Sequence, residues 1–316
     1  MRSHSETLRH ADLPEGSSVV VVSYWTGPIL FEAMDSVLAP DQKGVIELIL
    51  VDNGNPPEIS GELARRAQEE PRLTLINGHG NVGFARGCNI GARRAGGRYL
   101  LLLNPDCRLS PGAIPALLAE AQTLGEDWML GCRVLNPDGS DQRASRRALL
   151  TPYTALVETF RLDRLAPGLL RRYRLNHHDS PLPAETSSVP VISGACMMLP
   201  AATFHAAGGM DEGYFLHVDD LDLCFRLHRA GIPVWFTPHV EAVHHAGSSR
   251  INPVQVEWHK MRGFLRYFRL HFNKLRWLPL LVPLVVGILA RFGIKSAQSL
   301  LLIAWNRRPI TNDARD

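Results

Sequence analysis

Short apolar runs alternate with helical segments over the first hundred residues, and this alternation limits the folds that the chain can adopt. The runs are rich in Val, Ile and Leu, end in polar loops, and cover residues 19–22, 47–51, 73–76 and 99–103. Segments with helical spacing lie between them, at residues 29–38, 59–70 and 84–95. Strands that alternate with helices predict an α/β fold with a parallel sheet, which binds its ligands at the carboxyl ends of the strands.

The pattern changes after about residue 110. We expect a helix near residues 112–124, a strand near 129–135, strand structure at 189–199, a helix at 220–230 and a strand at 234–237. Residues 143–174 are rich in arginine and have weak periodicity, which we interpret as a mobile flap. These patterns divide the chain into a disordered start at 1–17, a main domain at 18–250 and a helical tail at 251–316.

The charge is divided unevenly along the chain. From Arg250 to the end there are 12 basic and 3 acidic residues, a net of +9, whereas the rest of the chain carries −6. Such a tail suits nucleic acid or anionic lipid, depending on the residues between the charges. The five cysteines include no close pair, and the first 18 residues contain no apolar stretch, so we expect no disulfide, no structural zinc and a cytosolic setting.

Two carboxylates follow predicted strands directly. Asp52 comes after the second strand and Asp106 comes shortly after the fourth. Because parallel strands end at one edge of their sheet, both side chains are expected there, where a nucleotide would bind. The alternative is that each residue only begins a turn, since Asp and Asn bond the local backbone after strands.

A glycine-bearing loop precedes the third helical segment. It runs through Gly80, Gly83, Gly87 and Gly91, and its free N–H groups are suited to an anion such as a diphosphate. Glycines also serve tight turns and close helix packing, so the loop alone is weak support for a binding site.

Five carboxylates lie within residues 211–222. Asp219, Asp220 and Asp222 fall at a predicted helix start, where capping accounts for one or two acids. A cluster of like charges needs a cation, a substrate or a raised pKa, which is the setting of a general base. His244 follows a predicted strand, and its imidazole is a candidate ligand for a divalent cation.

Taken in order, these segments resemble the inverting glycosyltransferases of family 2, and within them the rhamnosyltransferase-like branch. The matching segments are Val51-Asp52-Asn53, residues 80–89, Leu103-Asn104-Pro105-Asp106, and residues 139–147, 193–195, 211–226 and 244–249. The resemblance spans about residues 18–250. It implies a GT-A fold, with a Rossmann-like nucleotide-binding sheet and an acceptor-binding half, and a nucleoside-diphosphate-sugar donor.

The resemblance also implies roles for individual residues. Asp220 would be the catalytic base, and Asp106 with His244 would hold a divalent cation, Mg²⁺ or Mn²⁺, although Asn104 stands where many relatives carry a first Asp. The donor-binding residues would be Ser23, Asp52, Asn81, Gly83, Arg86, Asn89 and Asn104. Gly194, Asp219 and Asp222 would lie on the acceptor side.

The tail alternates bases with aromatic residues and then becomes apolar. The uncharged run from 277 to 290 is 14 residues long, whereas a comfortable spanning helix needs about 20 residues, and we expect Pro279 and Pro283 to interrupt it. Apolar blocks flanked by Trp and Arg predict an interfacial membrane element rather than a nucleic-acid arm. A helix packed on the domain, a dimer interface or a re-entrant hairpin are the alternatives.

These features together predict a cytoplasmic, peripheral enzyme at the inner face of the plasma membrane. It would transfer a sugar, with rhamnose as the leading candidate, to a polyprenyl-linked glycan of the cell envelope. Its expected partners include an anionic membrane surface and no nucleic acid. The arginines at 143–174 either contact an anionic acceptor or form a solvated surface. A non-catalytic sugar-nucleotide-binding scaffold and a nucleotidyltransferase are the rival functions, although a nucleotidyltransferase would need a basic loop after the first strand, which residues 25–28 lack.

Overall fold

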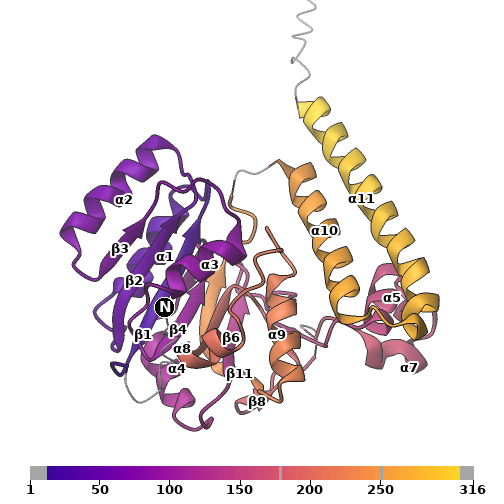
Figure 1. Cartoon of the computed structure of the whole chain (residues 1–316), viewed down its shortest axis with the longest axis horizontal. Coiled ribbons are helices and arrows are strands. Elements are labelled where there is room, and N and C mark those ends of the chain that lie inside the picture. The colour runs from indigo at the N-terminus through magenta and orange to yellow at the C-terminus, as the bar shows by residue number, and fades with distance from the viewer. Residues whose placement is uncertain (1–12, 178–179, 250–251, 307–316) are drawn as a thin grey trace, which may run out of the picture.

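The computed structural model describes residues 13–177, 180–249 and 252–306. Its centre is a nine-stranded mixed sheet in the order β3-β2-β1-β4-β10-β6-β11-β5, with β8 (Ser187–Ser188) paired to β11 (Figure 1). Helices cover both faces of the sheet, and two hydrophobic clusters fill the space between them. The predicted α/β architecture is confirmed.

The first half of the sheet is parallel, as predicted. Its strands are β1 (Ser17–Ser23), β2 (Val45–Asp52), β3 (Leu73–Ile76) and β4 (Tyr99–Leu103). The helices between them are α1 (Ile29–Leu38), α2 (Pro57–Glu69) and α3 (Phe84–Ala92). The predicted start at 1–17 lies, up to residue 12, outside the described residues.

Glycines let α3 pack closely on the sheet. A Cβ on Gly87 would lie 2.6 Å from Cγ1 of Val22, and one on Gly91 would lie 2.4 Å from Cγ1 of Val20. Both distances are shorter than any ordinary carbon contact, so these two positions require glycine for packing.

The second half of the sheet reverses direction. The strand β10 (Cys196–Pro200) is antiparallel to both β4 and β6 (Met129–Leu135), and β11 (Val234–His244) is parallel to β6. The short β5 (Cys107–Leu109) runs antiparallel to the end of β11. The helices of this half are α4 (Ala113–Ala121), α8 (Ala201–Ala206) and α9 (Asp219–Arg229). The sequence pattern did not predict β5 or α8, which are only three and six residues long.

The predicted flap at 143–174 is wrong for its first part. Arg146 and Arg147 form β7, are buried, and pair with β9 (Val191–Ile192). Arg146 donates to the carbonyl oxygens of Ser180 and Pro181, and its guanidinium lies 5.2 Å from the ring centre of Phe236. The rest forms α5 (Pro152–Phe160), α6 (Leu162–Leu165), α7 (Pro167–Leu170) and η2 (Arg171–Tyr173). Short helices leave little periodicity to detect.

The tail consists of α10 (Pro253–His271), η3 (Leu275–Trp277) and α11 (Leu278–Asn306), with α11 lying along α10 and reaching α5 (Figure 1). The expectation that Pro279 and Pro283 interrupt the apolar run is wrong, because α11 continues through Pro283 for 29 residues. Pro279 lies in the first turn, where no helical N–H is needed, and Pro283 removes a single hydrogen bond. By length and composition alone, residues 275–302 could cross a membrane, and an 18-residue window within them has a mean hydropathy of 2.0.

Candidate active site

Asp106 and His244 meet at the carboxyl end of β4. They are neighbours because β5, which follows Asp106, pairs with the end of β11 so that Cys107 lies opposite His244. Oδ1 of Asp106 lies 3.1 Å from Nε2 of His244, and its Oδ2 accepts a hydrogen bond of 2.7 Å from Ser248. Burial opposes ionisation of this carboxyl, but the bond and charge of His244 and the bond from Ser248 outweigh it and hold the pKa of Asp106 below its usual value.

Gln142 determines which imidazole nitrogen of His244 carries the proton. Its amide nitrogen donates to the carbonyl oxygen of His244 and to Oδ1 of Asn136, so its Oε1 is left to accept from Nδ1 of His244 at 2.7 Å. When the imidazole is charged, Nε2 donates to Oδ1 of Asp106; in the neutral imidazole that a metal requires, Nε2 carries a lone pair, which lies 3.1 Å from the amide of Asn104. A second residue that orients the imidazole in this way is typical of histidine metal ligands.

These two side chains fit a divalent cation that also binds a substrate. No group of three or more His, Cys, Asp or Glu residues is arranged to hold a metal in the part of the chain that is described. A cation such as Mg²⁺ takes one or two protein ligands and completes its shell with water and phosphate oxygens. Asp106 and His244, 3.1 Å apart, supply one carboxylate and one imidazole nitrogen, which is the number of protein ligands that such a cation takes.

The turn before β10 connects this pair to the acidic cluster. The backbone N–H of Asn104 donates to the carbonyl oxygen of Ala195 at 2.9 Å. The neighbouring Gly194 donates its N–H to Oδ2 of Asp220 at 3.2 Å, and a Cβ on Gly194 would lie only 3.0 Å from Cβ of Asp220. Asn104 and Asp220 are thus separated by two consecutive residues of one loop, and Gly194 allows that approach.

Asp220 is held by a buried arginine. A terminal nitrogen of Arg147 donates to Oδ2 of Asp220 and to the carbonyl oxygen of Ile192, while the N–H of Leu221 donates to Oδ1 of Asp220. The side chains of Arg147 and Asp220 are 9% and 16% exposed. Burial opposes ionisation, but the charge and hydrogen bond of Arg147 and the two backbone N–H groups outweigh it and hold the pKa of Asp220 below its usual value.

The pKa of Asp219 is shifted in the opposite direction to that of Asp220. Only 4% of the residue is exposed; its Oδ1 accepts from the N–H of Asp220, and its Oδ2 has no hydrogen-bond partner among the described residues. Burial, with the neighbouring charge of Asp220 in second place, raises the pKa of Asp219 to about 7. Adjacent carboxyls therefore differ in charge near neutral pH, which matches the need of a buried pair to avoid two like charges.

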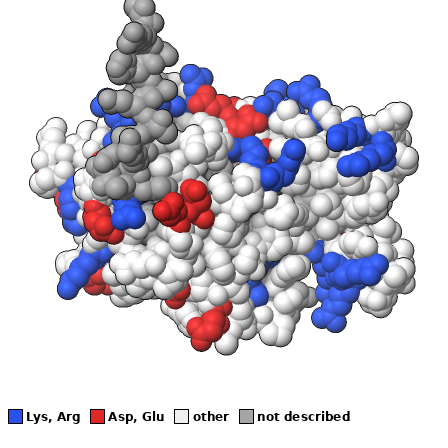
Figure 2. Space-filling model, turned by 60° about the horizontal axis from the view of Figure 1, so that its bottom comes forward, with Lys and Arg blue, Asp and Glu red and all other residues white. Residues whose placement is uncertain are grey.

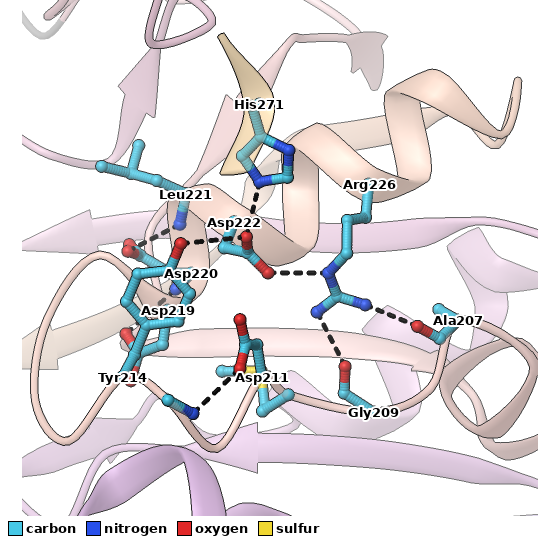
Figure 3. A network of polar contacts seen from close by, with 12 residues as sticks. Ala207, Gly209, Asp211, Tyr214, Asp219, Asp220, Leu221, Asp222, Arg226 and His271 are labelled. Atoms are coloured by element: carbon cyan, nitrogen blue, oxygen red, sulfur yellow. Dashed lines mark hydrogen bonds and ion pairs between the residues drawn. The ribbon is translucent and has the colours of Figure 1, made fainter. Parts of the chain in front are cut away.

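Asp222 joins the helices around the site (Figure 3). Its Oδ1 accepts from Tyr214 at 3.1 Å and lies 2.7 Å from Nε2 of His271, and its Oδ2 accepts from Arg226 at 2.7 Å. Arg226 also donates to the carbonyl oxygens of Ala207 and Gly209. Asp222 therefore ties α9 to α10 and to the loop before α9, and both of its oxygens already have partners.

Backbone N–H groups of the glycine loop donate to oxygen atoms of the protein itself. The N–H of Gly83 donates to Oδ1 of Asn81, and the N–H of Phe84 donates to the carbonyl oxygen of Phe215. Gly83 has φ +86°, and a Cβ there would lie 2.6 Å from that carbonyl oxygen. Two N–H groups expected to face an anion thus bind inside the protein.

The other predicted donor residues of α3 face the loop at 208–212. Asn89 donates to the carbonyl oxygen of Met210 and to Oε1 of Glu212, and its own oxygen accepts from the N–H of Met210. Nε of the exposed Arg86 lies 3.5 Å from Oε2 of Glu212. Asn89 therefore fixes the loop, while Arg86 keeps donors available to solvent.

Asp52 holds the turn that follows β2, in a corner of the sheet beside Ser23. Oδ1 of Asp52 accepts from the N–H groups of Gly54 and Asn55 and from the amide of Asn55, and Oδ2 accepts from Ser60. The amide of Asn55 also donates to the hydroxyl of Ser23, which lies opposite Asp52 in the sheet. Asp52 therefore makes the local turn contacts that the sequence analysis gave as the alternative to ligand binding. Its Oδ2 can accept a hydrogen bond from one further donor.

Three residues at this site received no individual role from the sequence, and Arg147, predicted only as part of a stretch that contacts an acceptor or solvent, is buried instead. Gln142 orients His244, Ser248 bonds Asp106, and Arg147 pairs with Asp220. All three lie in segments that carry the family resemblance, at 139–147 and 244–249. Their partners are about 70 to 140 residues away along the chain, so spacing alone could not connect them.

The sequence profile of "Glycosyl transferase family 2" matches residues 18–198. A curated relative from Mycobacterium tuberculosis, "N-acetylglucosaminyl-diphospho-decaprenol L-rhamnosyltransferase", is 27% identical over 257 residues, covering 73% of this chain and 76% of its own. "Rhamnosyltransferase WbbL" of Escherichia coli K12 is 23% identical and covers 72% of this chain and 83% of its own.

Solved structures share the fold. The mannosyltransferase PcManGT from Pyrobaculum calidifontis, determined with GDP-Man and Mn²⁺, superimposes with a TM-score of 0.54 at 16% identity. The match covers 93% of this chain and 82% of that one.

Proposed function

Because this chain belongs to glycosyltransferase family 2, we propose that it transfers rhamnose from a nucleoside diphosphate to a hydroxyl of a polyprenyl-linked glycan, with inversion at the anomeric carbon. The chain is a glycosyltransferase with a GT-A fold. The two rhamnosyltransferases at 27% and 23% identity support the sugar, and the decaprenol acceptor named for the first supports the lipid carrier.

The observation that carries this proposal is the connection of two charged centres through one loop. Asp106 and His244 lie at one end of it, Asp220 lies at the other, and Asn104, Ala195 and Gly194 join them by backbone hydrogen bonds. A donor diphosphate at the first centre would thus bring its sugar toward the second, as transfer between a donor and an acceptor requires.

On the donor side, the corner of Ser23 and Asp52 would receive the base and ribose. The exposed guanidinium of Arg86 and the amide of Asn104 would contact the diphosphate, next to the loop shaped by Asn81 and Gly83. Asn89 would act indirectly, by holding the loop at 208–212 in place. When bound at Asp106 and His244, a divalent cation supplies positive charge that offsets the charge developing on the leaving diphosphate.

On the acceptor side, Asp220 would accept the proton of the acceptor hydroxyl. The hydroxyl oxygen then forms the bond to the anomeric carbon from the face opposite the nucleoside diphosphate, and the bond to that diphosphate breaks, which gives the inverted product. Arg147 keeps Asp220 ionised at neutral pH, which leaves it able to take a proton but makes it a weaker base than the raised pKa expected from the sequence, and Gly194 lets the loop approach Asp220 closely. Asp219 and Asp222 would support this side by their positions around Asp220.

The tail would keep the enzyme at the inner face of the plasma membrane. One side of α11 packs on the protein, where Phe292 contacts Trp258 and Arg291 pairs with Glu257. Leu278, Val282, Val286 and Leu289 repeat at helical spacing and are exposed. An apolar stripe on a helix whose other side is packed suits a position in the membrane interface.

Donor binding and turnover test the proposal separately. Calorimetry with dTDP-rhamnose and UDP-sugars, in Mn²⁺ or EDTA, should show metal-dependent binding that the Asp106→Ala variant loses. Release of nucleoside diphosphate in the presence of a polyprenyl-diphosphate-linked sugar should then require Asp220. Folded protein that binds no sugar nucleotide would overturn the proposal.

A further inference from the structure

A basic and apolar surface lies at the amino-terminal end of α11 and reaches His271, the partner of Asp222. One part is residues 161–174, here called the strap, which contains α6, α7 and η2. The other part is a groove of about 460 Å³ beside Trp277, which Arg229, Lys274 and Arg276 help to line. Figure 2 shows Lys and Arg side chains at the right-hand end of the molecule, the end that carries α5 and α7 in Figure 1.

The charges of the strap are available to a partner. Arg161, Arg164, Arg171 and Arg172 are exposed, and no described acidic residue pairs with them. Asp163 is the one acid of the strap, and it pairs with Arg174 at 2.8 Å. The four exposed guanidinium groups thus form a cationic surface that no described carboxylate neutralises.

Exposed leucines lie among these arginines. Leu165 is 80% exposed and Leu169 is 62% exposed, and Leu275 at the start of η3 is 82% exposed. Large apolar side chains that remain in water beside several basic residues are the composition of a surface that binds the membrane interface.

Aromatic rings connect the strap to the groove and to α11. The ring centre of Tyr153 lies 6.3 Å from that of Tyr173 in the strap and 6.0 Å from that of Trp277. Arg172 lies over Tyr173 and Arg276 lies over Trp277, at 4.9 and 5.2 Å. Tyr and Trp with adjoining arginines are the side chains found at the level of lipid headgroups.

We propose that the strap and the groove form a second membrane contact, which binds the headgroups of anionic phospholipids. The inference rests on the proposed membrane-bound function and adds to it an element separate from the apolar stripe of α11. The strap arginines would bind phosphate groups, Leu165 and Leu169 would enter the interface, and Arg229 and Lys274 would hold a headgroup in the groove. Two contacts, on α11 and on the strap, would fix the orientation of the active site above the bilayer.

Vesicle binding by the full-length protein tests this proposal. The vesicles are phosphatidylcholine alone or with 30% phosphatidylglycerol, and binding is measured by flotation at low and high salt. The variants are Arg164→Gln with Arg171→Gln in the strap, Arg229→Gln with Lys274→Gln in the groove, and Leu165→Ser with Leu169→Ser. The matched control is Lys43→Gln with Arg94→Gln, which removes two exposed charges from the sheet half of the molecule.

Each double charge variant should bind the anionic vesicles roughly 10- to 30-fold more weakly, since each basic residue near such a surface contributes about 1 kcal/mol. The control should bind like the wild type, and high salt should remove the difference. Equal binding of wild type and charge variants, or equal binding to neutral and anionic vesicles, would overturn the proposal. Unchanged binding of the serine variant would overturn the insertion of the leucines.

Donor binding, measured by calorimetry on the same proteins, separates this proposal from the proposed function. The strap and groove variants should bind sugar nucleotides as the wild type does, because their residues lie outside the active site. Loss of vesicle binding with intact donor binding supports the second contact, whereas absence of donor binding in every protein concerns only the glycosyltransferase mechanism.

Discussion

Asp106 is buried and Asp220 is 16% exposed, and each carboxylate lies beside a nitrogen-bearing side chain, but the two partners differ in chemistry. His244 can be neutral, and Gln142 then leaves a lone pair on its Nε2, 3.1 Å from Asp106. Arg147 stays charged at every accessible pH and binds Asp220 directly. A pair with a neutral partner can admit a cation from solution, whereas a pair with a permanent cation repels one and keeps its carboxylate ionised.

The difference assigns separate tasks to the two ends of the site. The Asp106 end suits an exchangeable metal with a diphosphate, and the Asp220 end suits a proton acceptor that works without metal. The predictions below test whether the two ends are independent in this way.

The largest effect is expected for Asp220→Asn. An amide cannot accept the hydroxyl proton, so kcat should fall by about 10²- to 10⁴-fold, the usual contribution of a general base. Affinity for the donor and for Mn²⁺ should change little, because those ligands bind at the other end. Turnover is followed by release of nucleoside diphosphate, with the exposed Asp138→Asn as the control, and a variant that keeps its turnover would remove Asp220 from this role.

The next effect is expected for Arg147→Met, which leaves Asp220 buried without its cation. Breaking a buried ion pair by removing one partner costs about 3–5 kcal/mol, so urea unfolding should show a large loss of stability. The pKa of Asp220 should rise when the charge of Arg147 is absent, because burial then dominates. The acid limb of kcat/KM should therefore move to higher pH.

Arg147→Lys covers the case in which the methionine variant fails to fold. It keeps the charge but loses the second donor to Ile192, so its pH profile should lie between those of the wild type and Arg147→Met. An acid limb at the same pH in all three proteins would show that Arg147 serves stability alone.

A smaller effect is expected for Gln142→Leu, which acts on the other end of the comparison. Loss of an orienting partner of a metal-binding histidine typically weakens metal affinity by about 10- to 100-fold. The Mn²⁺ concentration for half-maximal activity should rise accordingly, while the pH at which Asp220 titrates should not move. A change in the acid limb of the pH profile would contradict the independence of the two ends.

The sequence predicted the Asp106 end of the site better than the Asp220 end. The parallel strands, and Asp52 and Asp106 at their ends, follow from patterns that are local along the chain. Arg147 could not be paired with Asp220 in this way, because 73 residues separate them and a two-residue strand brings Arg147 inward. The local pattern likewise predicted a tail that prolines interrupt, whereas α11 is continuous. The packing of α11 against α10 and α5 is a tertiary effect, which a local pattern does not contain.

The glycine loop shows the same limit at a single position. The pattern predicts free N–H groups at Gly83 and Phe84, but the carbonyl oxygen of Phe215 takes one of them from 131 residues further along the chain. A glycine that permits a close backbone approach and a glycine that exposes N–H groups to a ligand look identical in a sequence.

The smallest effect concerns Asp219, the neighbour that Arg147 does not reach. Its folded pKa of about 7 lies above that of an unfolded aspartate, so its contribution to stability is present below about pH 4 and is lost as the pH rises through 7. Asp219→Asn keeps the acceptor for the N–H of Asp220 and cannot ionise. It should leave Tm nearly unchanged at pH 4, and it should raise Tm progressively up to pH 8, by about 2–4 °C per kcal/mol. An equal change at both pH values would mean that Asp219 is neutral or ionised throughout, and that Asp220 alone carries the titration of this pair.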